Sequence, residues 1–318
     1  MILDEPRQIE LSFRGNGAQL LGIYFVNMLL TGITLGIYYP WAKAKIARYM
    51  HGETELEGER FVFHGTGQEM FIGFIKAVGI VFLFGLLVGV LSALFGEAGE
   101  VLGSILMFGL FMVGTPYAIH GSMRYRTSRT SWRSVHWGYR GDLKTFVQKF
   151  VIGWLLTIVT LGIYGSWYAE NIRSYLVDHT RFGNIEFRYE GDGLTYFLMN
   201  LKGIILTIFT AGIYFFWYNK EVFNYLIENT SARHEEEAIT FYSEMTGGAL
   251  LLHTLTNMLL IVVTLGIGFP WVIVRNLRFI YANITIEGSL NVERLVDTET
   301  AYNDALGEEL GDVMEAAF

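Results

Sequence analysis

The stretch TLGIYYPWAKAKIARY, residues 34–49, decides the fold because the chain repeats it. Near-copies begin at Thr160 (TLGIYGSWYAENIRSY), Thr210 (TAGIYFFWYNKEVFNY) and Thr264 (TLGIGFPWVIVRNLRF). A weaker fifth copy, PYAIHGSMRY from Pro116, aligns with PWAKAKIARY. The positions that we assign to this structural motif are Gly36, Pro40, Trp41, Tyr49, Pro116, Tyr117, Gly162, Trp167, Gly212, Trp217, Gly266, Pro270 and Trp271. Internal repetition predicts that one supersecondary unit recurs along the chain.

The composition predicts a membrane protein. Of the 318 residues, 52% are hydrophobic and 17% are charged, and the mean hydropathy is +0.36. Such a chain is too apolar to cover the surface of an ordinary soluble domain. Apolar runs cover residues 20–37, 71–95, 101–119, 150–163, 203–216 and 249–269. A bilayer core about 30 Å thick needs about 20 helical residues, so the second, third and last runs are long enough to cross it and the others are short.

Each repeat has the same predicted order of elements. A stretch with the alternation of a β-strand leads through a glycine turn into an apolar helix, and a TLGIY turn then leads into a polar return helix. The strand-like stretches begin at Gln8, Arg60, Ser134, Asn184, Ala238 and Asn283. We therefore predict five helical hairpins in residues 8–59, 60–133, 134–183, 184–237 and 238–294, which form one membrane domain over residues 1–294 and are followed by an acidic tail, residues 295–318.

The predicted fold class is a predominantly α, polytopic integral membrane protein of quasi-repeated helical hairpins, with short β-strands grouped at the cytoplasmic face. Short strands are unstable alone, so we expect them to pair with each other on one side of the membrane. Basic residues flank both ends of the hairpins, whereas GEAGE at residues 96–100 has none. The positive-inside rule then places both termini in the cytoplasm.

The return helices are the difficulty in this arrangement. A helix over residues 36–49 is about 21 Å long, which is too short to cross the bilayer core. The short hairpins are therefore either re-entrant or thin the bilayer locally. A rival arrangement, with one crossing helix and one interfacial helix in each repeat, would place successive strands on alternating sides. Proline at the first turn of a return helix loses no hydrogen bond, and tryptophan favours an interface or a cavity.

On TLGIYYPWAKAKIARYMHGETELEGERFVFHGTG and its repeats, the chain resembles the YjgN-like family of bacterial inner-membrane proteins of unknown function. The family pattern is a TLGIY-x-PW element followed by Arg-Tyr and a short strand, and it extends to about Arg294. The departures are Ser166 and Phe216 at the proline position and Gly268 at the tyrosine position. The resemblance implies the bacterial inner membrane and the hairpin fold, and it implies no activity or catalytic residue.

Polar residues of the return helices are the strongest functional candidates. They are Lys43, Lys45, Arg48, Glu170, Asn171, Arg173, Lys220, Glu221, Asn224, Arg275 and Arg278. Charges inside a membrane face a bundle interior or a water-filled cavity and mark solute paths. Basic residues dominate this set, so an anionic solute is the expected guest. The alternative, which stays open, is that these residues snorkel to lipid headgroups or form local pairs at the cytoplasmic interface.

The predicted function is a small-solute channel or transporter, and the alternative is a membrane-organising or lipid-interacting structural protein. We expect no enzyme, because the sequence has no cysteine, its histidines are scattered, and no Ser/His/Asp or paired-carboxylate group can be assembled. We expect membrane lipids as partners and neither a cofactor, a metal nor nucleic acid. The acidic tail is predicted to be either an amphipathic helix or a disordered segment.

Overall fold

The computed structural model describes residues 7–288, 290 and 292–299. Within these residues one sheet has eleven strands in the order β1-β11-β10-β9-β8-β7-β6-β5-β4-β3-β2. The strands are β1 (Arg7–Ile9), β2 (Leu11–Phe13), β3 (Thr54–Leu56), β4 (Glu59–Phe63), β5 (Thr130–Trp132), β6 (Val135–Tyr139), β7 (Thr180–Phe182), β8 (Ile185–Tyr189), β9 (Thr230–His234), β10 (Glu237–Ser243) and β11 (Ile284–Gly288). Every pair of neighbouring strands is antiparallel.

The sheet is a nearly closed ring. Its two end strands, β1 and β2, are consecutive in the chain and are separated by Glu10 alone. β1 pairs with β11, and Arg7 lies opposite Gly288; β2 pairs with β3, and Phe13 lies opposite Thr54. One bent strand therefore joins the first repeat to the last, which leaves the sheet with almost no open edge.

Ten α-helices in the described part of the chain form five pairs. The pairs are α1 (Gly17–Ile33) with α2 (Tyr39–Gly52), α3 (Gly67–Phe95) with α4 (Glu97–Ser128), α5 (Leu143–Val159) with α6 (Gly165–Asp178), α7 (Gly193–Phe209) with α8 (Phe215–Glu228), and α9 (Gly247–Val263) with α10 (Phe269–Ala282). A short 3-10 helix, η1 (Val292–Arg294), follows β11. Each of the five predicted repeat ranges contains one of these pairs.

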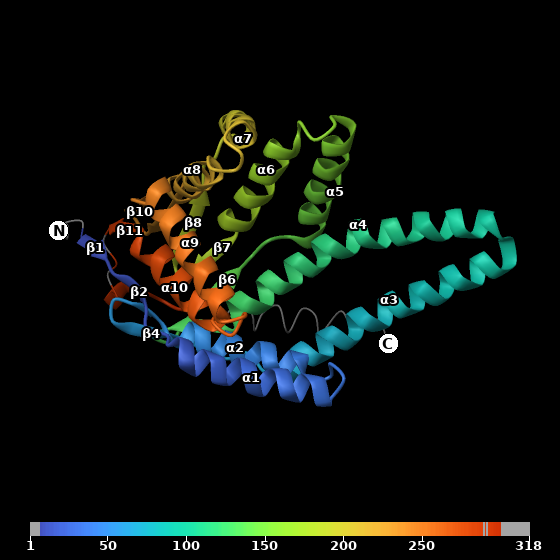
Figure 1. Cartoon of the computed structure of the whole chain (residues 1–318), viewed down its shortest axis with the longest axis horizontal. Coiled ribbons are helices and arrows are strands. Elements are labelled where there is room, and N and C mark those ends of the chain that lie inside the picture. Colours follow the sequence, from blue (N-terminus) through green and yellow to red (C-terminus); the bar gives the residue numbers. More distant parts are fainter. Residues whose placement is uncertain (1–6, 289, 291, 300–318) are drawn as a thin grey trace.

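All five helix pairs leave the ring from the same rim. Each pair is inserted between two neighbouring antiparallel strands, such as β2 and β3 or β4 and β5. At the other rim tight turns join the strands; Glu57 and Gly58, for example, have φ of 51° and 76°, as a type I′ hairpin turn requires. The helix pairs extend away from the strands and fan out, with α3 and α4 the longest (Figure 1).

The predicted fold class is wrong in its main element. The eleven-stranded, nearly closed ring organises the fold, rather than a bundle of membrane helices with a few strands at one face. Among the described helices, only α3 and α4 are long and apolar enough to cross a membrane by length and composition. The strands missed from the sequence, β3, β5, β7 and β9, follow directly on the return helices and have only three to five residues. Three residues carry no readable alternation, and the five of β9, TSARH, include one apolar side chain, Ala232.

The interior of the ring is a packed core. Trp132 is fully buried there, and its ring packs against Phe182 with the centroids 6.0 Å apart. The indole N–H of Trp132 donates to the carbonyl oxygens of Leu56 and Glu59, at 3.1 and 3.0 Å. Leu290 and Leu295, which follow β11, pack against the same cluster and cover the rim opposite the helices. Side chains fill the ring, as in other small barrels.

Candidate functional site

The helical hairpins expose an unusual amount of apolar surface. The most apolar stretch of 18 residues in α3 contains no buried residue. In the corresponding stretch of α4, 17% of the residues are buried. The turns of the four short hairpins are also apolar and exposed: Leu35 and Leu161 are each 94% exposed and Leu265 is 92% exposed. Large contiguous apolar surfaces of this kind mark a membrane or protein contact. The hairpins and their turns are therefore the candidate functional surface.

The first turn, between α1 and α2, satisfies its own backbone. The hydroxyl of Thr34 donates to the carbonyl of Leu30 at 2.7 Å and accepts from the N–H of Tyr38 at 3.0 Å. The backbone N–H groups of residues 34–37 and 39 donate to carbonyls within the turn or the end of α1. Every N–H of residues 34–39 thus has a partner inside the hairpin.

The other three short hairpins repeat this geometry. The hydroxyls of Thr160, Thr210 and Thr264 make the same two hydrogen bonds, with distances from 2.6 to 2.9 Å. The next two residues have positive φ in each turn: the first is Leu35, Leu161, Ala211 or Leu265, with φ from 49° to 53°, and the second is Gly36, Gly162, Gly212 or Gly266. The motif glycines thus lie at backbone positions that disfavour any side chain.

The motif tryptophans hold neighbouring repeats together. The Trp41 side chain lies against Gly67 of α3, and the same contact joins Trp167 to Gly193, Trp217 to Gly247 and Trp271 to Gly17. A methyl group on any of these glycines would lie within 3.0 Å of the facing tryptophan. The last contact joins the fifth repeat, which contains Trp271, to the first, which contains Gly17. The second and third repeats lack this contact, because Tyr117 stands at the tryptophan position and Leu143 at the glycine position. The tryptophans therefore pack between repeats, at the rim of the ring.

The remaining motif residues have local roles. Pro40 and Pro270 lie in the first turn of α2 and α10, whereas Pro116 lies inside the long helix α4 and Tyr117 beside it is exposed. The hydroxyl of Tyr49 donates to the carbonyl of Asn16 at 2.9 Å, and the N–H of Asn16 donates back to it at 2.6 Å. This pair fastens the end of a return helix to the start of the helix before it.

Several predicted polar residues also connect repeats. Arg48 donates to the carbonyl of Gly65 at 3.3 Å, and Arg278 donates to the carbonyl of Gly15 at 2.7 Å. Both carbonyls belong to strand-to-helix turns of the following repeat around the ring. Asn224 is hydrogen-bonded to the hydroxyl of Ser243, also in the next repeat, at 2.7 Å. Each of these side chains therefore forms a hydrogen bond from its own repeat to the next one.

Glu170 and Arg173 are the two predicted residues that the structure brings together as a buried ion pair. Glu170 is 4% exposed, and its carboxylate also accepts from the hydroxyl of Tyr189 at 2.7 Å. Burial raises the pKa of the Tyr189 phenol, so it remains a hydrogen-bond donor. The guanidinium of Arg173 lies over the rings of Tyr189 and Tyr196, 5.6 and 5.4 Å from their centroids. The charges of Glu170 and Arg173, both in α6, therefore neutralise each other, and the aromatic rings that cover Arg173 come from β8 and α7 of the next repeat.

The other predicted polar residues are spread over separate helices. Glu221 pairs with Lys202 of α7 at 2.7 Å, Arg275 donates to Thr256 at 2.8 Å, and Asn171 donates to Tyr164 at 3.4 Å. Lys43 is exposed, Lys220 is partly exposed, and Lys45 lies over the ring of Tyr38. Lys45 also lines an open groove of about 630 Å³ between α1 and α2, together with Gln19 and Glu53.

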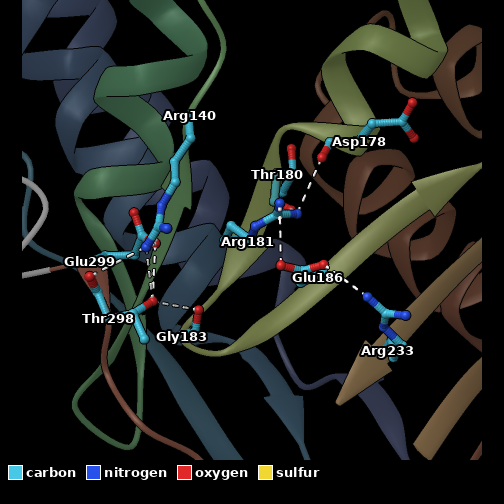
Figure 2. A network of polar contacts seen from close by, with 9 residues as sticks. All are labelled: Arg140, Asp178, Thr180, Arg181, Gly183, Glu186, Arg233, Thr298 and Glu299. Atoms are coloured by element: carbon cyan, nitrogen blue, oxygen red, sulfur yellow. Dashed lines mark hydrogen bonds and ion pairs between the residues drawn. The ribbon is translucent and has the colours of Figure 1, made fainter. Parts of the chain in front are cut away.

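The start of the predicted tail packs on the ring. Glu299 is 1% exposed, and its carboxylate accepts from Arg140 at 2.7 Å, while the hydroxyl of Thr298 donates to the carbonyl of Gly183 at 2.7 Å (Figure 2). Figure 2 also shows Arg181 and Arg233 on either side of Glu186, both at 3.5 Å. Residues 300–318, and with them most of the predicted tail, lie outside the described residues.

Sequence reasoning missed the residues that define the surface. The exposed leucines of the turns and the glycines that receive the tryptophans were not chosen, because both roles depend on packing far along the chain. A signal was present in the repeats themselves: Thr, an apolar residue, Gly and Ile recur in all four TLGIY copies, and Gly17, Gly67, Gly193 and Gly247 recur at the start of the apolar helices.

Comparison with known proteins identifies the family. A family described as "Bacterial protein of unknown function (DUF898)" matches residues 8–190 and 218–313. The chain belongs to this family. The curated protein "Inner membrane protein YjgN" of Salmonella typhimurium strain LT2 is 29% identical over 167 residues, which is 49% of this chain and 40% of that protein.

Relatives with the same name confirm the resemblance seen in the sequence. The YjgN protein of Escherichia coli O157:H7 is 34% identical over 132 residues, which is 42% of this chain and 31% of the relative. That of Escherichia coli strain K12 is 32% identical over 134 residues, which is 42% of this chain and 32% of the relative. The matched part thus spans less than half of each relative's length. No solved structure matches the chain.

Proposed function

We propose that this chain is an integral, multi-pass protein of the bacterial inner membrane whose helical hairpins lie in the bilayer. The observation that carries the proposal is the exposed apolar surface of the hairpins, all of which leave the ring from one rim. In water this surface would be unfavourable by about 25 cal/mol for each Å². The names of the relatives, which describe inner-membrane proteins, support the same location.

The ring is proposed to lie in water at the cytoplasmic face, with both termini on that side. Its outer face carries ion pairs suited to water, such as Glu55 with Arg14 at 2.8 Å and with Arg60 at 3.2 Å. Reporter fusions test this placement. A reporter after residue 299 should be active in the cytoplasm, and one inserted after Ala98, in the first turn of α4, should be active in the periplasm. The same side for both reporters would refute it.

The proposed role is that of a lipid-interacting structural protein. An anion channel or transporter, the function predicted from the sequence, needs charges that face a water-filled path. Arg48, Arg278 and Asn224 instead bind the next repeat, and Arg173 pairs with Glu170. These contacts support a structural use of the polar residues and give transport less support.

Reconstituted protein distinguishes the two roles. In proteoliposomes we expect no chloride or phosphate flux above that of empty vesicles, and in detergent we expect added phospholipid to raise the melting temperature. The Arg48→Gln variant should lower that melting temperature, because it leaves the carbonyl of Gly65 without this donor. Lys43→Gln, at an exposed position, is the matched control and should leave it unchanged. Anion flux that Arg48→Gln slows without a loss of stability would favour transport instead.

A further inference from the structure

The five hairpins differ in length by more than half the thickness of a bilayer core. The outgoing helices α1, α5, α7 and α9 have 17 residues each, and their return helices have 14. At 1.5 Å per residue these are about 25 and 21 Å long. α3 and α4 have 29 and 32 residues, or about 43 and 48 Å. The outgoing helix of the long hairpin is therefore about 18 Å longer than the other outgoing helices.

The ends of the hairpins differ in chemistry in the same way. The long hairpin reverses at Gly96, and residues 96–100 at its end, GEAGE, carry two glutamates. The four short hairpins have no charged residue in residues 30–38, 156–165, 206–216 or 260–271. Charged groups are costly in hydrocarbon, whereas the TLGIY turns contain only apolar, glycine, threonine and tyrosine side chains around the reversal.

The backbone N–H groups of the short turns are hydrogen-bonded within the hairpin, as a surrounding without water requires. An unpaired N–H costs several kcal/mol in hydrocarbon, and irregular backbone is otherwise tolerated there only when protein or water satisfies it. In each TLGIY turn the threonine hydroxyl accepts a hydrogen bond from the backbone N–H four residues later, which the reversal would otherwise leave unpaired. The remaining N–H groups of the turn donate to carbonyls of the same hairpin. A turn in water would need no such provision.

The leucines point to the same medium. Leu35, Leu161 and Leu265 adopt positive φ, which costs a residue with a side chain about 1–2 kcal/mol and which turns in water assign to glycine or asparagine. All three are more than nine-tenths exposed, so no contact within the protein offsets this cost. Burial of a leucine side chain in hydrocarbon contributes about 1.5–3 kcal/mol and does offset it.

We infer that the four TLGIY hairpins end inside the bilayer, with their turns in contact with lipid acyl chains, and that α3 and α4 alone among the described helices cross the membrane. This inference rests on the proposed function and names acyl chains as the partner of the turns. The strand ring then carries four half-crossing hairpins and one crossing hairpin, rather than five equivalent ones.

The chain offers a direct test because it has no cysteine. Single-cysteine variants Leu35→Cys, Leu161→Cys and Leu265→Cys probe the short turns. Ala98→Cys, at the start of α4, probes the end of the long hairpin, and Glu236→Cys probes the opposite rim of the ring. Each is treated with a membrane-impermeant maleimide in intact spheroplasts and in inverted membrane vesicles. Ala98→Cys should be labelled only in spheroplasts and Glu236→Cys only in inverted vesicles. The three turn variants should lose labelling in both preparations and regain it in detergent.

Each other result has a defined meaning. Labelling of the turn variants in spheroplasts would overturn the inference in favour of full crossings, and labelling in inverted vesicles would place the turns at the cytoplasmic interface. Protection of Ala98→Cys from the outside would overturn the crossing of α3 and α4. If all five variants were recovered in the soluble fraction, the proposed function itself would fail. A spin label on Leu35→Cys, attached before reconstitution, should be more accessible to oxygen than to a water-soluble nickel chelate; the reverse order would exclude acyl chains as the partner.

Discussion

Substitution of Gly17 by alanine should weaken the closure of the ring. An added methyl group would lie 2.5 and 2.8 Å from two ring carbons of Trp271, whereas carbon atoms pack at about 3.5–4.0 Å. The indole must therefore retreat by about 1 Å from a buried contact between the first and fifth repeats. Overpacking of this kind costs about 1–3 kcal/mol. We expect a loss of that size in the free energy of unfolding of the Gly17→Ala variant, measured by circular dichroism as sodium dodecyl sulfate is titrated into the detergent-purified protein.

The same helix supplies the control. Gly22 has no atom within 4 Å of the position that a methyl group would take, so Gly22→Ala should stabilise α1 by up to about 1 kcal/mol through helix propensity alone. In a Trp271→Leu background, Gly17→Ala should cost less than it does in the parent, because the smaller side chain makes room for the methyl group. Equal effects of Gly17→Ala and Gly22→Ala would refute the role that we assign to the tryptophan contact.

Further predictions concern the buried ion pair, the turns and the helix caps. Glu170→Ala should lower the free energy of unfolding by about 2 kcal/mol. The loss is smaller than for a fully buried ion pair, because the side chain of Arg173 is 27% exposed. Glu170→Gln should lower the free energy of unfolding less than Glu170→Ala in the dodecyl sulfate titration. Thr210→Val removes both hydroxyl hydrogen bonds of its turn and should cost about 1–2 kcal/mol; Thr207→Val, whose buried hydroxyl has no partner among the described residues, should be neutral, and equal losses would contradict us. The Asp142 carboxylate accepts from the hydroxyl and N–H of Thr145, which lowers its pKa below the ordinary 3.8. This stabilisation is complete above 3.8 and is lost as the pH falls through the folded pKa. The protection factors against amide exchange, taken relative to the unfolded chain at the same pH, should therefore fall in acid at the start of α5, while those at the threonine-capped start of α9 should not follow.

Local patterns in the sequence located most elements but not the architecture that they form. The alternation from Gln8, Arg60 and Ser134 onward lies in strands, and the TLGIY copies lie at helix reversals. The ring itself depends on pairing between distant segments, such as Arg7 with Gly288, and no local pattern contains that information. The three-residue strands in particular are strands only because a neighbour pairs with them.

The candidate site was only partly readable for a similar reason. A cation such as Arg48 has the same local sequence whether it faces a solute path or a carbonyl of the next repeat, so polarity at helical spacing could not separate the two. The leucines of the turns recur at the same position of the repeated motif, so the sequence alone shows that they are repeated. Their significance came from the positive φ and the paired backbone, which only the folded chain displays.

The contact of Trp271 with Gly17 has a consequence for how the chain could be cut. Four of the five neighbouring pairs of repeats meet through a tryptophan on a glycine, and this contact is the same whether the chain runs directly from one repeat to the next or, as between the fifth and the first, returns through the bent strand. The peptide links between repeats are therefore not what specifies their neighbours. Circular permutants that begin at a tight strand turn, such as the one at Glu235 and Glu236, should assemble the same ring. Two fragments separated there and produced together should find each other in the membrane and restore it.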